Sequence, residues 1–176
     1  SLCTAQLAAW NRLGDGTLIR AGQRLALRPP AGGGPRAEPA AGAEPPPAWR
    51  RPVPGPVLAG FGDSPLTASG IQLGGRPGQP VLAAASGEVV YAGSGLKGYG
   101  ELLIIKHGPA WLSAYGYNES LLVHEGERVV AGQAIARLGE GPAPDGGRRP
   151  ALHFEIRRNG IPLDPAGQLP PAARGP

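Results

Sequence analysis

The sequence predicts an all-β domain, and three features of its second half favour that fold. Short runs rich in Val, Ile, Leu and aromatic residues recur after residue 57, with glycines between them. No sustained helical period appears in this half. Asn159-Gly160, a dipeptide typical of two-residue hairpin turns, follows the last long run. We therefore expect an antiparallel fold of two packed sheets or a barrel-like sandwich.

Each expected strand follows from its local composition. The first runs, PVLAAAS, GEVVYAG, ELLIIKH and WLSAYGY, are short, apolar and bounded by turn-forming residues. HEGERVVAGQAIARLG predicts two short strands around the turn-prone AGQ, and ALHFEIRRNGIPLDP predicts a strand that ends in a hairpin. In chain order, these segments are residues 80–86, 87–93, 101–107, 111–117, 124–139 and 151–165.

The N-terminal part has a different character. Residues 1–27 predict a short helix, with Leu7 and Trp10 at helical spacing, and then a half-buried strand. Residues 28–56 are rich in Pro, Ala and Gly and predict an extended, semi-rigid linker. Trp49 is the exception within that linker, because it could either dock on the following domain or remain exposed.

Composition excludes several classes of protein. The chain of 176 residues carries a net charge of +4, a mild basic excess without a basic, aromatic-interleaved stripe, so we expect no nucleic-acid partner. Cys3 is the only cysteine, which rules out an intramolecular disulfide and a cysteine-based zinc knuckle. No segment approaches the roughly 20 apolar residues that a transmembrane helix requires.

Two segments carry a family resemblance. GEVVYAGSGLKGYG and LHFEIRRNG resemble the LytM or M23 peptidase domain of bacterial envelope proteins, most closely its NlpD-type branch of amidase activators. The resemblance covers residues 57–170 and leaves 171–176 as a tail. QLAAWNRLGDGTLIRAGQRLAL, within residues 1–27, resembles the second half of a LysM repeat, a module that binds N-acetylglucosamine-containing glycans.

The resemblance implies that the zinc site of this domain is lost. Active members of the family hold one Zn²⁺ with a His-x-x-x-Asp motif and the second His of His-x-His, and two further histidines assist. The first motif falls on Ala68 and Gln72, and Tyr117 and Ala151 stand where the assisting histidines would be. Only His153 keeps its identity. One imidazole cannot hold zinc at useful affinity, so we expect no metal, no cofactor and no hydrolysis.

Two other histidines could be proposed as substitute ligands. His107 ends an expected strand, and His124 lies among acidic residues. Their sequence context resembles family positions outside the zinc centre, so we expect ordinary hydrogen-bonded or solvated histidines. Glu155 and Arg157, on the same expected strand as His153, have the pattern of structural partners.

The function implied by the resemblance is regulatory. Domains of this branch dock on periplasmic zinc-dependent N-acetylmuramoyl-L-alanine amidases and relieve an autoinhibitory helix. We expect a monomeric, non-catalytic activator that acts on peptidoglycan in cell separation, in the periplasm and as an outer-membrane lipoprotein in the full-length protein. The groove around Ala68, Gln72, Tyr117, Ala151 and His153 is the expected contact.

Three alternative functions can be compared with the sequence. A zinc endopeptidase with unusual ligands would differ from an activator in its zinc content and its hydrolysis of wall peptides. A scaffold that binds peptidoglycan without any amidase is compatible with the sequence. A biotinyl or lipoyl carrier domain, suggested by EGERVVAGQAIARLG, fails because neither Lys97 nor Lys106 lies at the required hairpin tip.

Overall fold

The computed structural model describes residues 44–95 and 98–171, and it is all-β and antiparallel as expected. The predicted LysM fragment and residues 28–43 of the linker lie outside the described residues. No helix in the described part of the chain is long and apolar enough to cross a membrane. The elements in order are β1 (Val57–Ala59), η1 (Pro65–Thr67), β2 (Ile71–Gly74), β3 (Pro80–Leu82), β4 (Gly87–Gly93), β5 (Glu101–Lys106), β6 (Trp111–Leu121), β7 (Arg128–Val129), β8 (Ala134–Leu138), β9 (Glu140–Pro142), β10 (Arg148–Arg158), β11 (Ile161–Leu163) and η2 (Pro165–Gly167).

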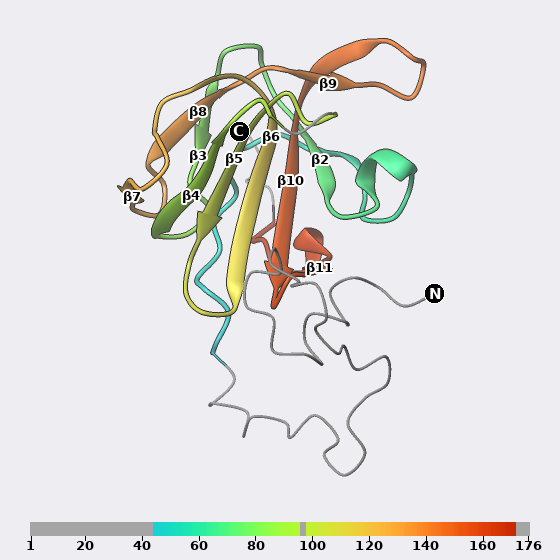
Figure 1. The fold of residues 1–176 in the computed structure, drawn as a ribbon. Helices are drawn as coiled ribbons and strands as arrows, with labels where there is room; N and C mark the ends of the chain where they lie inside the picture. The colour runs from blue at the N-terminus through green and yellow to red at the C-terminus, as the bar shows by residue number, and fades with distance from the viewer. Residues whose placement is uncertain (1–43, 96–97, 172–176) are drawn as a thin grey trace, which may run out of the picture. The chain divides into compact units, whose positions relative to one another are not determined.

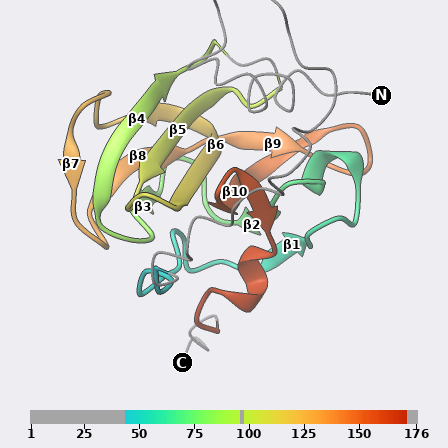
Figure 2. The same cartoon turned by 60° about the horizontal axis from the view of Figure 1, so that its bottom comes forward.

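The strands form one branched sheet around two long central strands. Its main path runs β1-β2-β10-β6-β5-β4-β7, and every pairing is antiparallel. The second half of β6 pairs with β8, and β8 pairs with β3, so the sheet continues into a second layer. Figures 1 and 2 show β5, β6 and β10 side by side at the centre of the main path. The two expected layers are thus joined through β6.

The core lies between these two layers. One apolar cluster joins residues of β5, β6 and β10 with residues of β3 and β8. Alternate residues of a strand point to opposite faces, so each central strand sends one set of side chains into this core and the other set to the outer face. The buried residues that meet there include Val81, Leu103, Ile105, Tyr115, Ile135, Leu138, Leu152, Phe154 and Ile156.

The hairpin predicted at Asn159-Gly160 is confirmed. Both residues have positive φ, 51° and 78°, and β10 pairs with β11 in register on either side of them. Positive φ at both central positions is the requirement of a type I′ turn, which Asn-Gly satisfies at low cost. This dipeptide therefore sets the register of the last hairpin.

The Pro-rich segment before β1 was expected to be linker up to residue 56, but residues 45–56 belong to the same compact unit as the strands. Trp49 is 7% exposed and packs edge-on against His107 and Trp111. The Arg50 N–H donates to the Ala84 carbonyl at 2.7 Å, and the Leu82 N–H donates to the Pro52 carbonyl at 2.8 Å. Burial of the indole and these backbone hydrogen bonds offset the cost of ordering the segment.

Candidate functional site

The outer face of β2, β6 and β10 brings together four of the five residues predicted to form the groove. In the strand register, His153 on β10 lies opposite Gln72 on β2, and the Tyr117 ring lies 5.7 Å from the His153 ring. Ala151 is two residues before His153, hence on the same face. Ala68 follows η1, is exposed, and makes no recorded side-chain contact with the other four among the described residues.

The side-chain amide of Gln72 makes a hydrogen bond through both its nitrogen and its oxygen. Its Nε2 donates to the Pro142 carbonyl at 3.1 Å, and its Oε1 accepts from Arg149 Nη2 at 3.1 Å. A guanidinium cation therefore contacts the side chain that stands where the family has a zinc-binding carboxylate. Arg149 precedes Ala151 by two residues on the same face of β10, so the cation is supplied from within the strand.

His153 is almost completely buried, with 1% exposure. Its Nε2 lies 2.9 Å from Glu155 Oε1, and the rings of Tyr99 and Tyr117 pack edge-on against the imidazole. Its Nδ1 is buried and has no hydrogen-bond partner among the described residues. Nδ1 is thus the ring nitrogen through which His153 could still contact a ligand.

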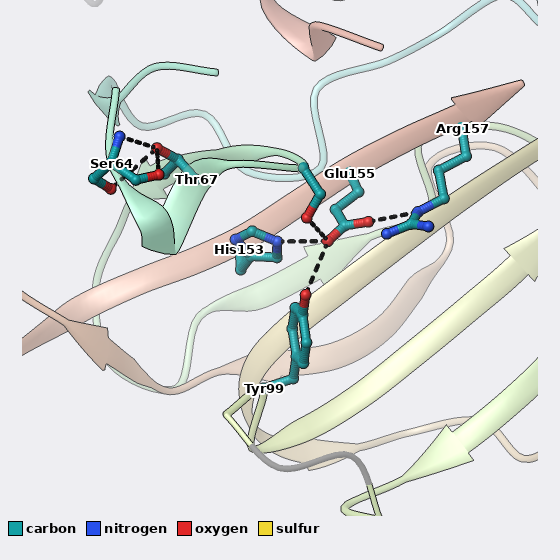
Figure 3. Close-up of polar contacts among 7 residues, drawn as sticks. Ser64, Thr67, Tyr99, His153, Glu155 and Arg157 are labelled. Atoms are coloured by element: carbon teal, nitrogen blue, oxygen red, sulfur yellow. Dashed lines mark hydrogen bonds and ion pairs between the residues drawn. The ribbon is translucent and has the colours of Figure 1, made fainter. Parts of the chain in front are cut away.

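Glu155 is the centre of the polar network on this face, as Figure 3 shows. Its Oε1 accepts from Ser69 Oγ at 2.6 Å and lies 2.9 Å from His153 Nε2, while its Oε2 accepts from Arg157 Nε at 2.8 Å. Tyr99 Oη donates a longer hydrogen bond to Oε1 at 3.5 Å. Burial alone would raise the pKa of Glu155, but the hydrogen bonds from His153, Ser69 and Arg157 lower it to about 2.

This carboxylate joins three segments of the chain. Ser69 comes from the loop before β2, Tyr99 from the segment before β5, and His153 and Arg157 from β10 itself. The loop that carries Ser69 is also braced internally, because Ser64 and Thr67 form reciprocal hydrogen bonds around η1 (Figure 3). Glu155 therefore links these three segments through hydrogen bonds and an ion pair.

Tyr117 has a backbone conformation that is costly for a tyrosine. Its φ is 63°, in the left-handed region. Its ring lies directly against the backbone of Gly141. A Cβ atom added to Gly141 would lie 2.5 Å from the Tyr117 ring, so a larger residue would clash there. Burial raises the pKa of the Tyr117 hydroxyl, and the nearby Tyr99 raises it further. Tyr117 is thus a neutral aromatic side chain at physiological pH.

Two hollows share Tyr117 in their lining, and the other four residues predicted to form the groove line neither of them. The first, of about 180 Å³, lies between the loop of η1 and Tyr99. The second, of about 380 Å³, lies toward the β9–β10 hairpin and includes Glu119, Glu140 and Arg148. Tyr117 is only 6% exposed, so it contributes to the lining of both hollows from a buried position.

The residues at the family's zinc positions do not fit a zinc ion. Ala68 has no donor atom, the amide of Gln72 is occupied and faces the positive charge of Arg149, and only His153 keeps a ligating side chain. Zinc in catalytic sites requires about three protein ligands. No three His, Cys, Asp or Glu side chains converge in a ligating arrangement within residues 44–95 and 98–171.

The other two histidines lie elsewhere. His107 contacts the Ser86 carbonyl through Nδ1 at 2.8 Å and Ser113 Oγ through Nε2 at 2.7 Å. His124 is exposed and pairs with Glu127 within a turn. Neither ring contacts His153 or Gln72, so the structure places both histidines outside the groove cluster.

Sequence reasoning missed three residues of this site, which are Ser69, Tyr99 and Arg149. Arg149 had a detectable signal, because residues 149, 151, 153, 155 and 157 alternate along one strand and must share a face. Ser69 and Tyr99 had none, since loops bring them to Glu155 from 86 and 56 residues away.

The antiparallel β domain and its groove define a zinc-peptidase type of fold whose ligand positions hold other residues. The family model described as peptidase family M23 matches residues 67–165. The chain therefore belongs to peptidase family M23.

Relatives and solved structures agree with this assignment. A Pseudomonas aeruginosa protein named Lipoprotein NlpD/LppB homolog is 52% identical over 122 residues, which are 69% of this chain and 40% of that protein. The Escherichia coli protein named Murein hydrolase activator NlpD is 46% identical over 122 residues, covering 69% of this chain and 31% of that protein. The antimicrobial peptidase lysostaphin from Staphylococcus simulans has a TM-score of 0.57 at 28% identity, over 65% of this chain and 48% of that one. The chain thus spans well under half the length of these two curated relatives.

Proposed function

We propose that this protein is a non-catalytic activator of periplasmic zinc-dependent N-acetylmuramoyl-L-alanine amidases, which promotes peptidoglycan hydrolysis in cell separation. One observation carries the proposal. The chain has the fold of a peptidase domain, yet an alanine and an Arg149-bound amide occupy two of the three metal-ligand positions of the family. A pre-formed concave surface that cannot hold the catalytic ion is suited to binding.

The names of relatives support an activator over an enzyme. Proteins from Escherichia coli and Salmonella at 46% identity are named murein hydrolase activators. Relatives from Pseudomonas and Haemophilus are named lipoproteins, the latter an outer membrane antigenic lipoprotein, which supports a place in the cell envelope. In this proposal the full-length protein is a lipid-anchored monomer of the outer membrane that faces the periplasm.

Activation requires that the groove bind the open form of the amidase better than the closed form. To convert a mostly closed population to a mostly open one takes about 5.5 kcal/mol of differential binding free energy. Aromatic side chains are favoured as anchors of such interfaces. In this proposal Tyr117 is the anchor, with Gln72, Ala151, His153 and the nearby Ala68 around it.

The test is a peptidoglycan-release assay with this chain alone, a zinc-dependent amidase of the same organism alone, and the two together. We expect release to rise in the mixture and this chain to carry no zinc by metal analysis. Tyr117→Ala should reduce the activation, whereas Ile161→Ala, at an exposed site on β11, should not. Unchanged activation by Tyr117→Ala would remove this residue from the contact.

The same assay separates the two competing functions. Release by this chain alone, abolished by a chelator, would identify a working zinc endopeptidase and refute the proposal. Binding to sacculi with no effect on any amidase would identify a peptidoglycan scaffold.

A further inference from the structure

A third hollow lies on the outer face of β5, β6 and β10, on the other side of Tyr99 from the groove. It has a volume of about 250 Å³. Its apolar wall and floor are Leu102, Ile104, Leu112 and Ala114, and its polar wall is formed by Tyr99, Glu155 and Arg157. None of the proposed groove residues lines it. It is therefore a separate feature that shares only its polar wall with the network described above.

Strand β5 carries apolar residues on both of its faces. Leu103 and Ile105 are fully buried in the core, while Leu102 and Ile104 point to the hollow. An antiparallel sheet that faces water on one side normally alternates apolar and polar residues, and a continuous apolar run is typical of a strand covered on both sides. Ile104 is partly exposed within the hollow, so the described residues cover this apolar face only in part.

The strand register explains why the surface is hollow there. Ala114 on β6 lies between Ile104 on β5 and Glu155 on β10 in one cross-strand row. The short side chain in the middle of that row leaves space between its larger neighbours. The next row places Leu112 between Lys106 and Arg157. The hollow therefore has an apolar floor and a cation on each side of one end.

Charge at that end favours an acidic ligand. Glu155 already accepts hydrogen bonds from Ser69 and Arg157 and contacts His153, so its charge is satisfied within the protein. In the strand register, Lys106 lies opposite Glu88 on β4. Glu88 in turn lies opposite Arg128 on β7. Because Arg157 also pairs with Glu155, three cations stand against two carboxylates around this end of the hollow, and the resulting single positive charge favours an acidic ligand.

We infer that this hollow is a second docking subsite for the activated amidase, and that it receives an apolar side chain of the partner next to a carboxylate that pairs with Lys106 and Arg157. The inference rests on the proposed function. The hollow is smaller than the roughly 300–1,000 Å³ of small-molecule sites, so an anchor side chain is the occupant that fits. The subsite extends the Tyr117 contact along the sheet, and it supplies both affinity and orientation.

The experiment measures the affinity of the full chain for the amidase by calorimetry, together with activation in the release assay. Ile104→Gln removes the apolar wall, and Lys106→Glu reverses the charge at its end. We expect each variant to weaken binding at least tenfold, with a parallel loss of activation. The matched controls are Ile161→Gln on β11 and Arg50→Glu in the segment before β1, which remove an apolar side chain and reverse a charge at exposed sites outside the hollow, and they should stay within twofold of wild type.

The outcomes separate this inference from the proposed function. If wild type activates the amidase and both hollow variants bind as wild type does, the subsite is refuted and the activator remains. If wild type neither binds nor activates the amidase, both proposals fail. Equal losses in Lys106→Glu and Arg50→Glu would indicate a diffuse basic face and overturn the subsite.

Other occupants of the hollow would leave different signatures. A concentration-dependent dimer in sedimentation, abolished by Ile104→Gln, would assign the face to a second copy of the chain. Faster proteolysis of residues 1–43 in Ile104→Gln than in wild type would assign it to that segment. Either result overturns the amidase as the occupant.

Discussion

The two faces of β10 differ in what holds them together. Toward the core, Leu152, Phe154 and Ile156 are fully buried among other apolar residues. Toward the groove, His153 and Glu155 are buried just as deeply, at 1% and 2% exposure, but through a network of hydrogen bonds. Both faces of this segment of β10 are thus equally buried. Apolar packing stabilises one face, and hydrogen bonds between polar side chains stabilise the other.

This difference shows how the domain can lose a metal site and keep its fold. Apolar packing is non-directional and depends on buried area, so it is unaffected by the residues on the other face. Buried polar groups require partners in specific positions, because an unpaired one costs about 1–3 kcal/mol. Glu155 supplies those partners for His153, Ser69 and Arg157, and the groove retains its shape without zinc.

The largest expected effect is on the core face. Phe154→Ala removes a fully buried ring that packs 5.3 Å from the ring of Tyr115. We expect a loss of about 3–5 kcal/mol in the free energy of unfolding, measured with denaturant. Ile161→Ala, at a side chain that is 65% exposed, is the control and should change little. A loss below 1 kcal/mol for Phe154→Ala would contradict the core assignment.

The next effect is on the groove face. Glu155→Gln removes the charge that satisfies His153 and Arg157, and we expect it to lower the free energy of unfolding at pH 7 by about 2–3 kcal/mol. The pKa of Glu155 is lowered from 4.5 to about 2 in the folded state, so its stabilising effect is present above pH 4.5 and is lost as the pH falls toward 2.

The Glu155 prediction is checked by unfolding at several pH values. Wild type should lose stability between pH 4.5 and 2, and Glu155→Gln should have a flatter profile over that range. Glu125→Gln, at an exposed carboxylate outside the network, is the matched control. Identical acid profiles for wild type and Glu155→Gln would show that the network does not stabilise the fold.

A smaller effect comes from a polar chain on the core side. His107 Nδ1 faces the Ser86 carbonyl and so carries a proton, and Ser113 Oγ lies 2.7 Å from Nε2 and 2.9 Å from Tyr115 Oη. Tyr115 Oη also accepts the Ala84 N–H. Ser113 Oγ donates to Tyr115 Oη, so His107, Ser113 and Tyr115 form one buried hydrogen-bonded chain.

Burial lowers the pKa of His107 below its usual 6.5, although the bond to Ser86 opposes the shift. The unfolded chain therefore binds this proton more tightly, and the contribution of His107 to stability is present above pH 6.5 and is lost as the pH falls below it. We expect thermal stability to fall between pH 7.5 and 5.5, by less than the Glu155→Gln effect. His107→Gln should flatten this slope, whereas His124→Gln should leave it unchanged.

The smallest effect isolates the backbone of Tyr117. Tyr117→Gly and Tyr117→Ala both remove the ring, but only glycine adopts a φ of 63° without strain. We expect the Gly variant to be more stable than the Ala variant by about 1 kcal/mol in denaturant unfolding. Equal stabilities would mean that the chain relaxes at this position once the ring is removed.

Much of the fold followed from local sequence. GEVVYAG and ELLIIK coincide with β4 and β5, and Asn159-Gly160 forms the expected turn. The end of the linker did not follow, because proline content predicts an extended backbone but says nothing of where Trp49 docks. That docking depends on His107 and Trp111, which lie about sixty residues further along the chain.

The sequence by itself determined the all-β class and the identity of the residues at the family's zinc positions, since an alanine has no donor atom in any conformation. Only the tertiary structure decided what those positions do instead. Arg149 reaches Gln72, and Ser69 and Tyr99 reach Glu155, because strand register and loop paths bring distant segments to one face. The partial exposure of Ile104 was likewise decided by the tertiary structure, because the burial of a side chain depends on which residues pack against it.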